Sequence, residues 1–209
     1  MQERTKSLPY KISYPKGKKT NILLSIPHCG TAFPEEIINH YNTSKIIKPD
    51  DTDWYLEKLY DFANDLGITV IEAIYSRWVI DLNRTPQNKS LYDDGRIITS
   101  LCPVTDFKGE PLYTSIGHEP TQEEIQRRLL TYYQPYHVKI DLILDELRNE
   151  FGQVLFWDAH SIRRNVSTIQ KNDFPDLILG NNDCKTASLK IIENVLNSLK
   201  ESNLSVEHN

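Results

Sequence analysis

The stretch Asn21-Ile22-Leu23-Leu24-Ser25-Ile26-Pro27-His28-Cys29-Gly30 decides the fold predicted for this chain of 209 residues. Its first six residues form a short apolar run, which ends at Pro27 and the turn formers that start at Cys29. Such a run is typical of a buried strand in an α/β protein. The loop that follows the strand holds His28.

Short apolar runs alternate with longer helical periods along the rest of the chain, which is the pattern of an α/β fold. The sequence predicts further strands at residues 68–71, 78–82, 153–157 and 176–179, with the run 153–157 in a central position. Helices are predicted at residues 51–66, 121–147 and 185–200. Pro135 should kink or divide the second helix near residues 133–134.

Composition and charge favour one globular domain over residues 1–209. Apolar residues make up 39% of the chain and charged residues 25%, and no Pro-, Gly- or Ser-rich linker divides it. A net charge of −5, without a block of like charge, argues against binding to nucleic acid or to an anionic membrane. No apolar run approaches the roughly 20 residues that span a bilayer, and the N-terminus lacks the apolar core of a signal peptide.

The three cysteines, Cys29, Cys102 and Cys184, are widely separated and lack a CxxC spacing. An odd number in this arrangement indicates neither a thiolate metal site nor a disulfide framework. We therefore expect a reducing compartment and a cytoplasmic protein.

Polar side chains occur where an open α/β sheet places its ligands, which is after strands and at the start of a helix. His28 follows the first strand, His160 follows the run 153–157, and Asp51 and Asp53 open the first long helix. Two imidazoles and one carboxylate from separate elements are the ligand set of a catalytic zinc that keeps its fourth position for water. The alternatives are histidines that are packed or solvent-facing and aspartates that only cap the helix.

Asp158 lies two residues before His160, so both side chains point to the same side if the strand continues. Its carboxylate could then orient the imidazole and fix which nitrogen faces the metal. A hydrogen bond to a neighbouring loop is the alternative role.

Cationic residues accompany these positions. Arg77 and Arg84 flank the predicted strand at residues 78–82, and Arg163 follows His160. Asn83, next to Arg84, adds a neutral amide to the same loop. Guanidinium groups bind carboxylates bidentately, so arginines beside a zinc site would suit a small anionic substrate. Weak surface salt bridges are the alternative.

An ordered set of motifs resembles the N-formylglutamate amidohydrolase family, whose members are also called N-formylglutamate deformylases. The motifs are, in chain order, PHCGTAFP from residue 27, DDTDW from residue 50, YSRWVIDLNR from residue 75, GEPLY from residue 109, YYQPYH from residue 132 and WDAHSIR from residue 157. Each motif is weak alone, but the ordered set is specific and runs from about Pro27 to Gly180.

The resemblance implies a three-layer α/β/α domain with a central mixed, mostly parallel sheet, similar to the phosphorylase/hydrolase-like fold of zinc carboxypeptidases. It also implies hydrolysis of N-formylglutamate to formate and glutamate in histidine degradation. By this likeness His28, Asp51 and His160 would bind Zn²⁺, because similar zinc amidases place their acidic ligand at the start of the helix. Asp53 is the alternative to Asp51.

The same resemblance implies that the arginines near these positions bind the substrate. Asn83 and Arg84 match the family's DLNR motif and resemble the Asn-Arg pair with which zinc carboxypeptidases hold a substrate carboxylate. Arg77 and Arg163 are expected to add to this substrate-binding group.

The chain departs from the family pattern after the predicted helix that ends near Lys200. The family continues with a Gly-rich segment, a further His and a Leu-Glu motif whose glutamate resembles the general base. Glu207 and His208 lie in a polar tail that does not match this motif. We therefore expect a truncated chain with no general base assigned, and an exposed sheet edge or a homo-oligomer partner where the last strands would lie.

Two other functions stay open from the sequence. A zinc hydrolase of another N-acyl amino acid, or of a cell-wall peptide amide, would share the metal ligands without the demand for an acidic substrate. A catalytically weak or inactive anion-binding homologue would keep the fold and the arginines but lack the base.

Overall fold

The computed structural model describes residues 8–86, 100–166, 170–182 and 184–208. The chain divides into two compact units, one up to Ser161 and one from Ile162 onward. The organisation as one domain over residues 1–209 stays a prediction.

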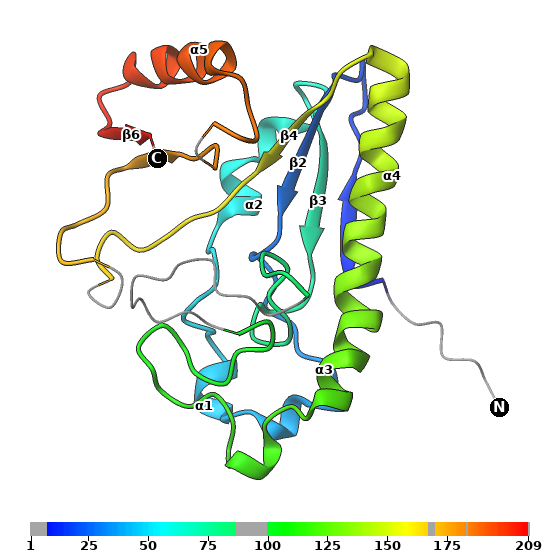
Figure 1. Cartoon of the computed structure of the whole chain (residues 1–209), viewed down its shortest axis with the longest axis vertical. Helices are drawn as coiled ribbons and strands as arrows, with labels where there is room; N and C mark the ends of the chain where they lie inside the picture. The colour runs from blue at the N-terminus through cyan, green and yellow to red at the C-terminus, as the bar shows by residue number, and fades with distance from the viewer. Residues whose placement is uncertain (1–7, 87–99, 167–169, 183, 209) are drawn as a thin grey trace. The chain divides into compact units, whose positions relative to one another are not determined.

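A four-stranded sheet forms the centre of the first unit (Figure 1). Its strands are β1 (Tyr10–Ser13), β2 (Ile22–Ile26), β3 (Thr69–Ala73) and β4 (Leu155–Asp158), in the spatial order β1-β3-β2-β4. β2 pairs in parallel with both β3 and β4, whereas β1 runs antiparallel to β3. The predicted mixed, mostly parallel α/β sheet is therefore confirmed.

Helical segments cover both faces of this sheet because successive residues of a strand point to opposite sides. Leu23 packs in one core cluster with buried side chains of the long helix α4 (Gln134–Phe151). Leu24 packs in a second cluster with residues of α2 (Leu56–Leu59) and of the 3-10 turn Asp61–Ala63. The first unit thus has the three α/β/α layers that the family resemblance implies.

The first long helix, predicted at residues 51–66, is wrong. Tyr55 adopts a left-handed conformation with φ of 67°, and only α2 and the 3-10 turn Asp61–Ala63 follow it. Residues 51–54 are turns and loop instead of a first helical turn. Of the four apolar positions that suggest this helix, Leu56 and Ala63 lie in the core, whereas Leu59 and Leu66 are 63% and 60% exposed.

Two strand predictions also differ from the structure. Residues 78–82 form no strand but a series of turns, although Val79 and Ile80 are buried. The run predicted as a central strand is β4, which lies at the end of the described strand order. Buried apolar residues alone cannot distinguish a strand from a packed turn.

The predicted second helix is three consecutive segments: α3 (Gln122–Arg128), a π-helical turn (Leu129–Tyr133) and α4. Thr121 caps α3 by accepting a hydrogen bond from the Glu124 N–H at 3.3 Å. Pro135 lies in the first turn of α4, so the predicted division near residues 133–134 is confirmed. Among the described residues, no helix has both the length and the hydrophobicity to cross a bilayer.

Short helical turns complete the first unit. They are the 3-10 turns Ile38–His40 and Ile116–His118 and the helix α1 (Thr43–Ile46). The turn Ile38–His40 and α1 lie between β2 and β3 in the chain, and the turn Ile116–His118 lies between β3 and α3.

The second unit contains a strand, a helix and a parallel strand: β5 (Leu177–Leu179), α5 (Leu189–Lys200) and β6 (Val206–His208). The polar tail, for which no element was predicted, is therefore partly a strand, in which Glu207 pairs with Ile178 of β5.

Gly30 lets the loop after β2 lie flush against the chain that follows β3. A Cβ atom at this position would come within 2.4 Å of the Tyr75 carbonyl oxygen and 2.7 Å of the Ile74 carbonyl carbon. Two backbone hydrogen bonds hold the contact, from the Ala32 N–H to Ile74 at 3.1 Å and from the Ser76 N–H to Ala32 at 2.9 Å.

We predict that Gly30→Ala lowers the free energy of unfolding by about 1–3 kcal/mol, because backbone atoms must move to admit the methyl group. Gly17→Ala is the matched control, since nothing lies within 4 Å of a Cβ there. It should change stability by less than about 0.5 kcal/mol. Urea unfolding measures both, and equal midpoints would contradict the packing argument.

Candidate metal centre

The candidate site lies at the carboxyl ends of β2 and β4, two parallel neighbours in the sheet. The chain runs from β2 to β3 on one side of it and later returns to place β4 on the other side, so the strand order reverses at β2. Such a switch point opens a crevice at the strand ends. His28 follows β2 and His160 follows β4, and the rings lie 4.9 Å apart between their centroids.

A buried carboxylate hydrogen-bonds to the ring nitrogen of His28 that faces away from the site. Its Nε2 lies 2.8 Å from Oδ1 of Asp81, which is fully buried. Burial opposes the charge of Asp81, but interactions with His28 and Arg77 hold the pKa of this carboxyl well below its usual range. An ionised carboxylate only accepts hydrogen bonds, so Nε2 is the donor in this contact, and Nδ1 is the ring nitrogen that faces the site.

His160 has the same arrangement at a more open position. Its Nε2 lies 3.1 Å from Oδ2 of Asp158, and its Nδ1 lies 3.0 Å from Oδ2 of Asp53. Burial disfavours the imidazolium, but the hydrogen bonds to Asp158 and Asp53 raise the pKa of His160 to about 9. A metal ion at Nδ1 would therefore have to displace a proton, and metal binding would weaken as the pH falls.

Asp53 faces both imidazoles from the loop before α2. Its backbone N–H donates to the His28 carbonyl at 3.0 Å, which ties this loop to the end of β2. Its Oδ2 lies 3.0 Å from Nδ1 of His160 and 3.7 Å from Nδ1 of His28. Despite burial, these contacts hold the pKa of Asp53 well below its usual range.

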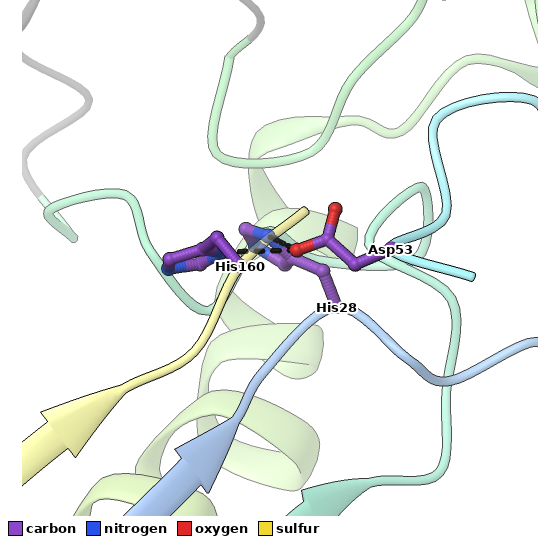
Figure 2. A group of neighbouring side chains, drawn as sticks. All are labelled: His28, Asp53 and His160. Carbon is purple, nitrogen blue, oxygen red and sulfur yellow. Dashed lines mark hydrogen bonds and ion pairs between the residues drawn. The ribbon is translucent and has the colours of Figure 1, made fainter. Parts of the chain in front are cut away.

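The three side chains point toward one another from three separate segments (Figure 2). One ligand atom from each of His28, Asp53 and His160 lies within 4.8 Å of the others. Nδ1 of His28 is buried without a hydrogen-bond partner among the described residues, whereas buried polar atoms usually have one. Two nitrogens and one carboxylate oxygen, with a carboxylate behind each imidazole, fit a zinc ion that keeps an open position.

Asp51, the acidic ligand favoured by the family resemblance, is not part of this group. Its Oδ2 accepts a hydrogen bond from the Trp78 indole at 2.9 Å, and both oxygens face the Phe107 N–H at 3.2–3.3 Å. Because no regular helix begins at Asp51, its side chain ties two loops together. The structure places the alternative, Asp53, beside the two histidines.

The cations around residues 77–84 converge on Asp81. Arg77 donates to Oδ2 of Asp81 at 2.6 Å and lies over the Phe107 ring at 4.9 Å. Nε of Arg84 lies 3.7 Å from the same oxygen. The backbone N–H of the exposed Asn83 donates to Oδ1 of Asp81 at 2.9 Å. The side-chain Nδ2 of Asn83 lies 3.4 Å from Nε2 of His160.

Arg163 is exposed and belongs to the second unit. Its expected part in substrate binding stays a prediction. Asp158, by contrast, takes the position behind His160 that its spacing predicts.

Sequence reasoning missed Asp81. The residue was included in a predicted strand and given no role, yet it contacts His28, Arg77 and the Asn83 backbone. A signal was present, because a carboxylate inside the apolar run Trp78–Leu82 needs a buried partner.

Comparison with known proteins gives a consistent result. Residues 20–209 match the N-formylglutamate amidohydrolase family. An N-formylglutamate deformylase from Pseudomonas putida is 43% identical over 159 residues, which cover 76% of this chain and 58% of the relative. Another, from Pseudomonas aeruginosa, is 41% identical over 172 residues, which cover 82% of this chain and 62% of the relative. The chain thus spans about six tenths of the length of these curated relatives.

Two solved structures share the fold. The crystal structure of N-formylglutamate amidohydrolase from Ralstonia eutropha JMP134 has a TM-score of 0.80 at 23% identity and covers 97% of this chain and 77% of its own. The crystal structure of a gene product from Agrobacterium tumefaciens has a TM-score of 0.72 at 18% identity and covers 98% of this chain and 74% of its own. At these identities the likeness is one of fold.

We predict that Asp81→Asn weakens zinc binding by about 10–100-fold, because a neutral amide no longer selects the His28 tautomer with a free Nδ1. Asp158→Asn should have a smaller effect, since the Asp158 side chain is 33% exposed and water can replace it. Competition with a chromophoric chelator measures both affinities, and urea unfolding checks that each variant is folded. An Asp81→Asn variant with wild-type zinc affinity would contradict this role.

Proposed function

The chain belongs to the N-formylglutamate amidohydrolase family, and from this we propose that it hydrolyses the N-formyl amide of N-formylglutamate to formate and glutamate in a zinc-dependent reaction. The observation that carries the proposal is the convergence of His28, Asp53 and His160 at the switch point of the sheet. The names of the relatives supply the substrate class.

In this proposal His28, Asp53 and His160 hold the metal, while Asp81 and Asp158 keep the imidazoles in the tautomer that presents Nδ1. A bound zinc ion would polarise the formyl carbonyl and lower the pKa of a bound water toward neutrality. The general base is left unassigned.

Substrate carboxylates would be held by Asn83 and Arg84. Asn83 is exposed beside His160, so its amide can reach a ligand at the metal centre. Arg77 was expected to share this task, but its guanidinium is used by Asp81 in the structure. We therefore assign Arg77 to holding Asp81. Arg84, whose Nε lies farther from this carboxylate at 3.7 Å, is assigned to the anionic substrate.

The cellular setting is also part of the proposal. Release of glutamate from its N-formyl derivative is consistent with a role in histidine degradation. Cys29, Cys102 and Cys184 are all free thiols, which supports a reducing, cytoplasmic location. The zinc-carboxypeptidase-like architecture, the small anionic N-acyl amino acid as substrate and a homo-oligomeric partner belong to the same proposal.

We predict that the zinc-loaded protein releases formate from N-formylglutamate and that removing zinc with a chelator slows this at least about a hundredfold. Zinc should restore the rate, and His160→Ala should abolish the restoration because it removes one ligand. A coupled formate assay measures each rate. Glutamate binding by calorimetry without turnover at any zinc loading would instead identify an anion-binding homologue.

A panel of substrates tests the specificity. Arg84→Met should raise the KM for N-formylglutamate by about 10–100-fold, because it removes a charge-assisted hydrogen bond. The same variant should leave the KM for N-formylglutamine amide nearly unchanged, since that substrate has no carboxylate. Equal losses for both substrates would contradict the specificity assigned to Arg84, and faster turnover of neutral N-acyl amino acids would favour the other hydrolase class.

A further inference from the structure

The buried segment Trp78–Arg84 has no β-ladder to hold it. It consists of turns, yet Trp78, Val79 and Asp81 are almost completely buried. A buried backbone carbonyl without a partner is costly, so such a segment needs hydrogen-bond donors from elsewhere. This matters for the site because the same segment carries Asp81, Asn83 and Arg84.

Side chains supply these donors. The Tyr41 hydroxyl donates to the Trp78 carbonyl at 3.0 Å, and the Arg128 guanidinium donates to the Val79 carbonyl at 3.0 Å. These two bonds anchor the apolar first half of the segment.

The second half is held by two residues of the YYQPYH motif, to which the proposed reaction gives no role. The His137 imidazole lies with Nε2 3.0 Å from the Leu82 carbonyl oxygen, and the Tyr133 hydroxyl donates to the Arg84 carbonyl at 2.9 Å. The two bonds therefore fall on either side of Asn83. The Tyr133 and His137 rings also contact each other in a tilted arrangement, with 4.2 Å between their centroids and an angle of 34° between their planes.

The burial of His137 and its carbonyl partner explain why its imidazole is a donor here. Burial lowers the pKa of His137, so the imidazole is neutral, and a carbonyl partner requires the proton on Nε2. Since the bond needs only one N–H, another side chain that places an N–H at the same point could replace it.

The π-helical turn Leu129–Tyr133 lies directly before these residues. Pro135 would collide with the Thr131 carbonyl in a regular α-helix, and a widened turn relieves that clash. Such turns change which side chains of a helix share a face. In this helix Arg128 before the turn and Tyr133 at its end both face the segment Trp78–Arg84.

We infer that Tyr133 and His137 form a clamp that positions Asn83 and Arg84 for the substrate carboxylates. Both are positioning residues, because they act through the backbone on either side of Asn83. The inference rests on the proposed function for its substrate, but the clamp itself can be tested without turnover.

The test uses Tyr133→Phe and His137→Phe, which remove the donors and keep aromatic rings. Each should raise the KM for N-formylglutamate about threefold to tenfold, as expected for loss of one hydrogen bond, with a smaller change in kcat. Each should also speed deuterium exchange of backbone amides in peptides covering residues 78–84. His137→Gln should restore both values toward wild type, because its amide N–H can reach the Leu82 carbonyl.

Tyr132→Phe is the matched control. It is the same substitution one residue earlier, and it removes a 2.7 Å hydrogen bond to the Glu36 carboxylate instead of a bond to the segment. It should leave the KM and the exchange of residues 78–84 unchanged even if it lowers the unfolding midpoint.

The outcomes separate the clamp from the proposed function. Unchanged exchange in Tyr133→Phe and His137→Phe, or an equal effect of Tyr132→Phe, would overturn the clamp. If the wild-type protein fails to hydrolyse N-formylglutamate, the proposed function fails, while the exchange measurement still decides whether Tyr133 and His137 hold the segment.

Discussion

The buried charge of Asp81 is the constraint on which the rest of the site depends. A carboxylate that is 0% exposed stays ionised only if donors surround it. Asp81 receives them from His28, Arg77 and the Asn83 backbone, and each bond has a structural consequence. The bond to His28 fixes an imidazole tautomer, and the bond to Asn83 shapes the loop beside His160. One buried charge thereby links His28, a candidate metal ligand, to Asn83, a proposed substrate-binding residue.

The sheet supplies the other half of the arrangement. Parallel pairing of β2 with β4 brings the ends of two strands that are distant in sequence to the same edge, and His28 and His160 leave the sheet there. Asp53 joins them because its N–H is bonded to the His28 carbonyl. The consecutive helical segments α3, Leu129–Tyr133 and α4 also have a second role besides packing on the core. Their residues Arg128, Tyr133 and His137 hydrogen-bond to backbone carbonyls of the segment Trp78–Arg84, which pairs with no described strand.

Local sequence predicted the parts of this structure that depend on local physics. The strand at β2, the division at Pro135 and the place of Asp158 behind His160 all follow from spacing and residue type. The choice between Asp51 and Asp53 could not be made this way. It depends on which carboxylate the Trp78 indole and the Phe107 amide capture, and these partners are 27 and 56 residues away. The turns at residues 78–84 were missed for the same reason, because their hydrogen bonds come from distant side chains.

The central claim is that Asp53, together with the two histidines, binds the metal, and Asp51 does not. Zinc content measured by mass spectrometry on purified Asp53→Asn and Asp51→Asn variants tests it most directly. An Asn side-chain oxygen at position 51 can still accept hydrogen bonds from Trp78 and Phe107, so Asp51→Asn should fold. Urea unfolding checks that both variants are folded. The account predicts that Asp53→Asn loses the zinc that the wild type and Asp51→Asn retain. Zinc kept by Asp53→Asn and lost from Asp51→Asn would contradict it.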